Sequence, residues 1–175
     1  MIQRPENNEY KSYFQRYVDL VQEGHFEDIF KQNTEEMIAV FSHIPSDLHT
    51  YRYAEGKWTI KDMLMHIIDT ERVFSYRMLV AARHDIETQL YSMNENFYAA
   101  NMHTETRSME SLIEEFKAVR KSTEMLLLNL SDEQSRFLAN AMSYQVSARA
   151  LGYITVGHAM HHMNILKERY LSQEQ

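Results

Sequence analysis

Apolar residues recur at intervals of three and four over most of the chain, which is the spacing of amphipathic helices. Five segments follow this spacing, one short and then four longer, at about residues 9–21, 26–42, 59–83, 108–130 and 147–171. Residues 46–57 are polar and irregular, and residues 84–107 are expected to form a loop with a helical turn near 95–101. The pattern therefore predicts an all-α fold, a four-helix bundle with an extra short N-terminal helix.

Hydroxyl residues stand where the predicted helices begin. The segment Thr59–Asp62 has the arrangement of a capping box, and Ser131–Gln134 repeats it before a short turn. Ser108 and Ser147 are N-caps for the third and fourth long helices. Only 4 glycines and 2 prolines occur in 175 residues, which leaves few sites for tight turns and favours long helices with short connections.

Length and charge limit the classes of protein. A chain of 175 residues fits one domain, 1–175, and can bury a hydrophobic core without disulfides. A net charge of −7 with no basic run disfavours nucleic-acid binding, because phosphate neutralisation supplies most non-specific affinity. The longest apolar run, around residues 125–128, is too short to span a membrane, and residues 1–8 lack the pattern of a signal peptide. We therefore expect a cytoplasmic protein that binds neither membrane nor nucleic acid.

The histidines are the residues that indicate a metal-binding site. The chain has 9 histidines and no cysteine, which excludes thiolate ligands and a cysteine nucleophile. His158 and His162 lie four residues apart on the last predicted helix, about 40° apart around its axis and about 6 Å from each other. They lie on the seam expected to face the bundle interior, where a shared metal ion would satisfy both imidazoles. Ala159 stands where a zincin-type metalloprotease has glutamate, which argues against that class.

A third histidine, His66, lies beside an apolar stripe on a different predicted helix. Three histidines from two helices can form a site that keeps open positions for water or substrate. Imidazole ligands suit zinc, nickel, copper or iron and do not select among them. His161 lies beside the face of His158 and His162 and is a candidate for the pocket wall or for a group behind the ligands. The other histidines are expected on the surface: His25, His43, His49, His84 and His103.

Short motifs that belong together occur along nearly the whole chain, and the last of them is the most specific. They are Pro5 and Glu9, Tyr17 with Val21, Lys57-Trp58-Thr59-Ile60 to His66, Asp69-Thr70-Glu71-Arg72, Tyr76-Arg77, Ala82-Arg83, Val119-Arg120, and Gly157-His158 through His161-His162 to Arg169-Tyr170. In these positions the sequence resembles the DinB/YfiT-like superfamily of metal-binding four-helix proteins, in the branch whose domain is called DinB-like.

The resemblance implies more than the spacing predicts. It implies an up-down-down-up bundle whose long second connection crosses over, and a metal triad of His66, His158 and His162. It also implies a nickel or zinc ion, a small-molecule substrate and a homodimer. Some relatives transfer a low-molecular-weight thiol to an electrophile, or isomerise a substrate with such a thiol. Many others are described as metal-dependent hydrolases.

One position departs from the family pattern. Where the branch usually has Phe-Asp-Glu, this chain has Met93-Asn94-Glu95, so that Asn94 replaces a carboxylate. Asn94 is a candidate pocket residue, or it only caps a helical turn, which asparagine does as well as aspartate. Glu71, Arg72 and Arg77 look like signature residues of the branch, for which intramolecular ion pairs are favoured over catalytic roles.

Three functions are compatible with these residues. In the first, a metal on three neutral imidazoles lowers the pKa of a bound water or thiol and supplies a nucleophile for hydrolysis or thiol transfer. The thiol would be a cosubstrate, since the chain has no cysteine, and no protein general base is evident beside the ligands. In the second, a dimeric bundle binds a metal or a ligand without catalysis. In the third, the histidines are vestigial in a structural dimer.

Overall fold

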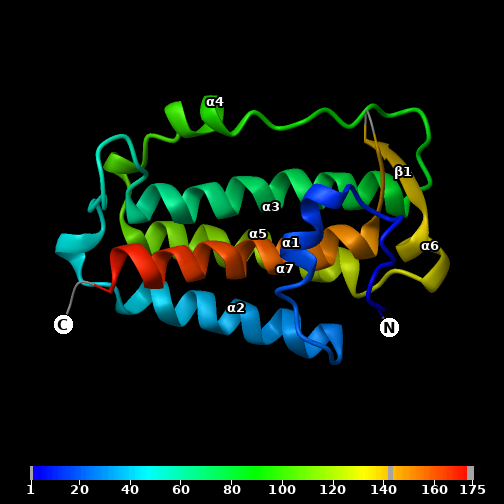
Figure 1. The fold of residues 1–175 in the computed structure, drawn as a ribbon, viewed down its shortest axis with the longest axis horizontal. Helices are drawn as coiled ribbons and strands as arrows, with labels where there is room; N and C mark the ends of the chain where they lie inside the picture. Colours follow the sequence, from blue (N-terminus) through cyan, green and yellow to red (C-terminus); the bar gives the residue numbers. More distant parts are fainter. Residues whose placement is uncertain (1, 142–143, 173–175) are drawn as a thin grey trace.

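Four long helices form the bundle in the computed structural model, which describes residues 2–141 and 144–172. They are α2 (Phe26–His43), α3 (Ile60–Ala82), α5 (Met109–Leu127) and α7 (Ala148–Ile165), the last continuing into a π-helical turn at Leu166–Tyr170. α3 packs against both α5 and α7 (Figure 1). The four predicted long helices are confirmed, with small shifts at their ends.

The directions of the helices follow an up-down-down-up order. α2 and α7 run in one direction and α3 and α5 in the other, so the consecutive helices α3 and α5 are parallel (Figure 1). Parallel neighbours need a long connection, and residues 83–108, the crossover segment, run back along the outside of the bundle to provide it. This segment carries α4 (Glu95–Ala100), where a helical turn was predicted, and a 3-10 turn at Thr104–Thr106. The topology that the resemblance implies is confirmed.

Side-chain caps set the starts of the site-bearing helices. Thr59 Oγ1 accepts from the backbone N–H of Asp62 at 3.0 Å, and Asp62 Oδ2 accepts from the backbone N–H of Thr59 at 2.9 Å. This is the predicted capping box of α3, and Ser108 and Ser147 cap α5 and α7 as predicted. Each cap satisfies backbone donors that a helix start otherwise leaves unpaired.

The N-terminal segment is less helical than predicted. In place of one helix over residues 9–21 it forms a 3-10 turn at Ser12–Phe14 and a short helix, α1 (Gln15–Val18). A second 3-10 turn, Ser46–Leu48, lies in the stretch expected to be irregular.

Glu9 explains why the N-terminal helix does not begin earlier. Its carbonyl oxygen accepts from the backbone N–H of Ser147 at 3.2 Å, and its carboxylate accepts from the Ser147 hydroxyl at 2.6 Å and from Arg149 Nε at 2.7 Å. Burial raises the pKa of Glu9, but the bonds from Arg149 and Ser147 outweigh it and hold the pKa below its usual value. The N-terminal segment is therefore bonded to the start of α7 rather than to a helix of its own.

A short hairpin was not predicted. It follows α6 (Asp132–Arg136), which begins with the predicted capping box at Ser131. The strands β1 (Leu138–Ala141) and β2 (Tyr144–Ser147) pair antiparallel and lead directly into α7. Each strand has only four residues, which is too short for alternation of apolar and polar residues to signal a strand. Apart from this hairpin, the all-α prediction is confirmed for the described residues.

Two apolar clusters form the core, and they meet on α7 at Gly157. Before this glycine, Ile154 and Val156 belong to the cluster that packs against α1 and the hairpin. After it, Ala159 and Met163 belong to the cluster between α2, α3 and α5. The histidine face of α7 thus lies at the boundary between two well-packed regions.

Gly157 allows α1 to touch α7. A Cβ atom at Gly157 would lie 2.0 Å from the backbone oxygen of Tyr17, so a side chain does not fit without displacing α1. Gly152 on the same helix is different, because a Cβ there would meet side chains and not backbone: the end of Leu127 at 2.5 Å and the edge of the Phe26 ring at 3.3 Å. The close approach at Gly157 holds Tyr17 beside His158.

Arg120 joins three helices of the bundle. Its Nη2 lies 2.9 Å from Oε2 of Glu71 on α3, and both side chains are 2% exposed. Its Nη1 donates to Asn33 Oδ1 on α2 at 2.9 Å, and the guanidinium stacks over Phe30 and Phe116. The contact with Glu71 is close but not aligned as a hydrogen bond, so charge attraction dominates it. The ion pair predicted for Glu71 is confirmed.

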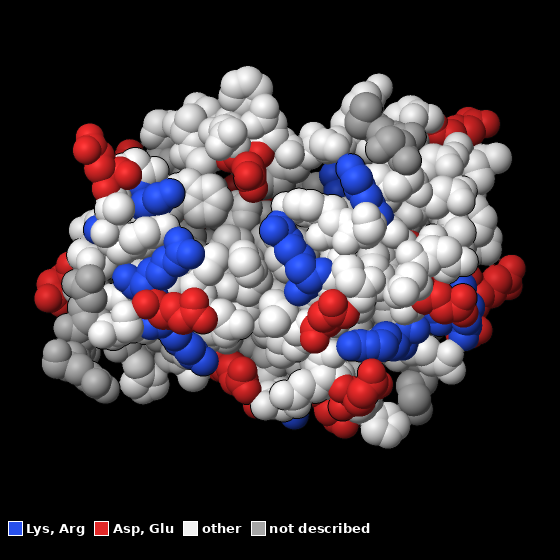
Figure 2. All heavy atoms as spheres, in the orientation of Figure 1, with Lys and Arg blue, Asp and Glu red and all other residues white. Residues whose placement is uncertain are grey.

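The surface shows no field of one sign on the face drawn in Figure 2, where acidic and basic side chains are mixed. Arg72 lies in such a mixed cluster, with its Nη2 2.7 Å from Glu115 Oε1, so its predicted ion pair is confirmed as well. Among the described residues, no helix combines the length and the apolar character that a membrane crossing requires.

Replacing Glu71 by leucine, or Arg120 by methionine, should lower the free energy of unfolding by about 3–5 kcal/mol, because each change leaves a buried charge without its partner. The double variant should recover much of this loss, because both charges are removed together. Denaturant unfolding of the four proteins gives the coupling energy. Additive losses would show that the two side chains do not depend on each other.

Gly157→Ala should lower the free energy of unfolding by about 1–3 kcal/mol, because the new methyl group displaces the backbone at Tyr17. Gly152→Ala is the matched control on the same helix and should cost less, since the Leu127 side chain can rotate away. Thermal and denaturant unfolding measure both variants. Equal losses would contradict the importance of the contact between α1 and α7.

Candidate metal centre

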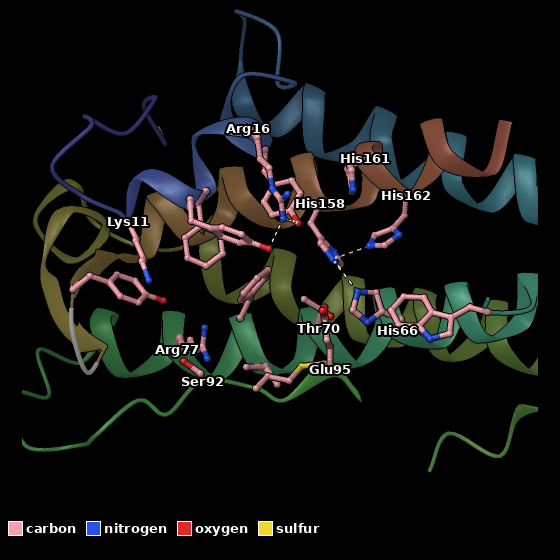
Figure 3. Close-up of a pocket in the computed structure, with 18 residues that line it drawn as sticks. Lys11, Arg16, His66, Thr70, Arg77, Ser92, Glu95, His158, His161 and His162 are labelled. Atoms are coloured by element: carbon pink, nitrogen blue, oxygen red, sulfur yellow. Dashed lines mark hydrogen bonds between the residues drawn. The ribbon is translucent and has the colours of Figure 1, made fainter. Parts of the chain in front are cut away.

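Three histidines meet where α3 and α7 pack together (Figure 3). His66 lies on α3, and His158 and His162 lie one turn apart on α7. All three side chains are buried. The spacing of four residues places two of the rings on one face of α7, and the packing of α3 against that face supplies the third.

The three rings point their Nε2 atoms toward one place. His158 Nε2 lies 3.1 Å from His66 Nε2 and 3.1 Å from His162 Nε2, and one ligand atom from each ring lies within 4.8 Å of the others. Two imidazole nitrogens that bind one zinc ion at about 2.0–2.1 Å are separated by roughly 2.9–3.4 Å. Two of the three separations lie in this range and all three ligand atoms lie within 4.8 Å of one another, so the donor set suits one divalent ion.

Burial keeps these imidazoles neutral. It lowers the pKa of His66 to about 4. Burial, with the nearby His66 adding to it, lowers the pKa of His162 to about 3. The pKa of His158 lies well below its usual value of 6.5, first because of burial and then because of His162 and His66. Neutral imidazole carries the free lone pair that a metal ligand needs.

Aromatic rings surround the three histidines. The Trp58 ring lies 4.5 Å from that of His66, and the Tyr17 ring lies 5.4 Å from that of His158, measured between centroids. Arg16 Nη2 donates to the Tyr17 hydroxyl at 2.9 Å. Neither Tyr17 nor Arg16 was expected at the site, because the apolar face of a helix looks the same in the sequence whether it faces a core or a cavity.

A cavity of about 430 Å³ opens beside the histidines. Its walls come from the N-terminal segment, α3, the crossover segment, β2 and α7. Figure 3 shows the three histidines toward one end and Lys11 and Arg77 toward the other. The volume lies in the range of small-molecule sites.

His161 lines this cavity without joining the three convergent rings. Its ring lies 5.2 Å from that of His162 and 5.5 Å from that of Tyr17. Burial, and after it the charge of Arg16, lowers its pKa below the usual value. The remaining histidines lie away from the cavity, exposed or half-buried, as predicted: His25, His43, His49, His84 and His103.

Asn94 caps α4 and does not line the cavity. Its Oδ1 accepts from the backbone N–H groups of Asn96 and Phe97 at 3.2 and 3.3 Å. Its neighbours Met93 and Glu95 do line the cavity. Of the two roles considered for Asn94, the geometry provides the cap.

Arg77 departs from the ion pair predicted for it. It is buried and lines the cavity, and its Nη2 donates to the Tyr91 carbonyl oxygen at 2.7 Å. Among the described residues, no carboxylate lies within ion-pair distance of it. The spacing of charges along α3 did not indicate that Arg77 would lack an ion pair, because the segment that packs over it, the crossover segment, belongs to a different part of the chain.

Comparison with known proteins places this site in a family. A family model described as the DinB superfamily matches residues 29–166. No curated protein sequence matches the chain.

Solved structures with the same fold are known. The structure of YfiT from Bacillus subtilis, described as a probable metal-dependent hydrolase with an unusual four-helix bundle topology, is 13% identical with a TM-score of 0.65, covering 95% of this chain and 90% of that one. A DinB-like protein of Bacillus subtilis is 18% identical with a TM-score of 0.62, covering 87% and 93%. A mycothiol-dependent maleylpyruvate isomerase is 14% identical with a TM-score of 0.65, and the match covers 79% of this chain but 58% of that one.

At these identities the structural likeness shows a shared fold. The match to the family model shows membership of the family as well as a shared fold, because it spans most of the chain and includes His66, His158 and His162. On this ground, the chain belongs to the DinB superfamily.

Proposed function

We propose that the protein is a metal-dependent enzyme that holds one divalent ion, nickel or zinc, on His66, His158 and His162. The ion would activate water or a low-molecular-weight thiol, so the reaction is a hydrolysis or a thiol transfer. One observation carries the proposal: three neutral imidazoles from two helices converge at the wall of a cavity large enough for a small molecule.

Three protein ligands leave open positions at an ion, and the cavity lies where those positions can be reached. A bound divalent ion lowers the pKa of a coordinated water or thiol to near neutrality. The thiol has to enter as a cosubstrate, because the chain has no cysteine. A site that only joins two helices needs no cavity beside it, which favours catalysis over a structural ion.

Side chains around the histidines would exclude water from the site and accept a proton. Trp58 and Tyr17 lie against His66 and His158 and line the same cavity, where their rings would displace water from around the histidines. His161 supplies an imidazole on the cavity wall, and burial, with Arg16 adding to it, lowers its pKa and so favours the neutral form. It is our candidate for the group that accepts a proton, a role for which the sequence had indicated no residue.

The names of two similar structures support this class of chemistry. YfiT is described as a probable metal-dependent hydrolase, and the maleylpyruvate isomerase depends on the thiol mycothiol. The homodimer and the cytoplasmic location that we expected from the sequence remain predictions. Sedimentation analysis would test the first of them.

Replacing His66, His158 or His162 by alanine should lower the affinity for zinc or nickel by at least about 100-fold, because one of three ligands is lost. The fold should persist, since the core is large enough without the ion. Competition with a chromophoric chelator measures affinity, and circular dichroism reports folding. His43→Ala, an exposed histidine on α2, is the matched control and should change neither.

The same variants test catalysis. The metal-loaded protein should turn over at least one substrate in a screen of thiols with electrophiles and of esters and amides, and His158→Ala should abolish that turnover. Metal binding without turnover across the screen would favour a non-catalytic binding bundle. Unchanged metal affinity in His158→Ala would overturn the proposed site itself.

The metal-free protein should lose stability as the pH falls from 6.5 toward about 4. Histidines of the unfolded chain take up protons near pH 6.5, whereas burial delays protonation of the folded His66 until about pH 4 and of His162 until about pH 3. The unfolded state therefore binds more protons in this window, and each imidazole contributes a slope of up to about 1.4 kcal/mol per pH unit.

Denaturant unfolding in the presence of a chelator at several pH values measures this slope. His66→Gln removes one titrating imidazole and should make the curve shallower between pH 6.5 and about 4. Parallel curves for the wild type and the variant would contradict the burial of a neutral His66.

A further inference from the structure

Two positive side chains, Lys11 and Arg77, lie at the end of the cavity away from the three histidines (Figure 3). Four charged residues line the cavity in all, and a third positive one, Arg16, lies beside Tyr17 nearer the histidines. Glu95 is the single carboxylate among the described lining residues. This excess of positive charge occurs in a chain whose net charge is −7. A positive cavity in a negative protein attracts anions selectively.

Arg77 differs from the other buried arginines of the described chain. Arg120 and Arg149 are each 2% exposed, and each has a buried carboxylate partner, Glu71 and Glu9 respectively. Arg77 is also buried, at 5% exposure, but within residues 2–141 and 144–172 no carboxylate pairs with it. A buried guanidinium without a counter-charge is costly, so the fold retains at this position a charge that it does not itself neutralise.

The hydrogen bonds of Arg77 leave most of its donors available. A guanidinium has five N–H donors, and one bond, from Nη2 to the Tyr91 carbonyl oxygen at 2.7 Å, accounts for one of them. This bond orients the group against the crossover segment. Its cationic carbon lies 5.8 Å from the centre of the Phe74 ring, which fixes its other side. Burial lowers the pKa of Arg77, as expected for a desolvated cation.

Apolar surface separates Arg77 from the three histidines. The Phe74 ring lies between them, 5.8 Å from the guanidinium carbon of Arg77 and 6.1 Å from the His158 ring, and Phe14 packs edge to face on it at 6.2 Å. Val73 also lines the cavity. A molecule that fills the cavity therefore meets an anion-binding group, then an apolar stretch, then the histidines.

We propose that Arg77 is the anchor of a carboxylate-binding subsite, and that the protein takes small molecules in which an apolar part separates a carboxylate from the reacting group. The carboxylate accepts hydrogen bonds from the guanidinium, whose planar fork matches its two oxygens. Lys11 and Arg16 add positive charge at the exposed rim and draw the anion in. The position of the reacting group rests on the proposed metal centre, whereas the anion subsite does not.

A matched pair of probes tests the subsite. Phenylpropionate and phenylpropionamide have the same shape and differ in charge, and their binding can be followed by protein-observed NMR titration in buffer of low salt without phosphate. The wild-type protein should bind the carboxylate about tenfold or more tightly than the amide, as expected for a charge-assisted hydrogen bond. Equal binding of the two probes would overturn the proposal.

Substitutions then assign the effect to Arg77. Arg77→Met should weaken phenylpropionate binding by about tenfold or more and leave phenylpropionamide binding unchanged. Arg72→Gln, on the same helix but outside the cavity, is the matched control and should leave both unchanged. Lys11→Met alters an exposed side chain and should weaken only the carboxylate, by a smaller factor. If Arg77→Met fails to fold, the Lys11 variant decides, and an unchanged preference for the carboxylate in it would overturn the cationic subsite.

Repeating the titrations with and without bound zinc separates the two proposals. A preference for the carboxylate that depends on Arg77 in the metal-free protein supports the subsite, whether or not the protein binds a metal. A preference that appears only with zinc and disappears in His158→Ala would place the carboxylate on the ion, and it would overturn the role of Arg77 while leaving the metal centre intact.

Discussion

Desolvation of three imidazoles is the constraint on which the rest of the site depends. His158 Nε2 lies 3.1 Å from the Nε2 atoms of both His66 and His162, and the three side chains are buried. Each nitrogen has one in-plane position, occupied by either a proton or a lone pair, and burial disfavours adding a charge. A cation shared by three lone pairs satisfies all of them at once. The bundle therefore keeps the rings neutral, with the lone pairs that a shared metal ion would need.

The scaffold holds this arrangement through contacts that lie outside the site. Arg120 and Glu71 join α2, α3 and α5, and so fix the helix that carries His66. Glu9 bonds the N-terminal segment to the start of α7, and Gly157 allows the same segment to lie against α7 near His158. Buried charges and one glycine therefore position aromatic and cationic groups over a cavity that the bundle alone would leave open.

The crossover segment shapes the other side of the cavity. It exists because α3 and α5 are parallel, so that the chain has to return along the bundle before α5 can begin. In returning, it brings Met93 and Glu95 to the cavity and gives Arg77 a carbonyl partner at Tyr91. The topology that separates this fold from a simple antiparallel bundle is thus also what closes its candidate binding site.

The sequence by itself determined the helices, their caps and the pairing of His158 with His162, because these follow from local periodicity and from hydrogen bonds over three or four residues. The position of His66 beside an apolar stripe made it a candidate third ligand, and the family motifs added its place in a metal triad and the helix order. Only the tertiary structure decided that Tyr17 lies beside His158, that Asn94 lies outside the cavity and that no carboxylate among the described residues pairs with Arg77. These features depend on segments remote in the chain, and a residue's spacing along its own helix carries no information about what packs against it.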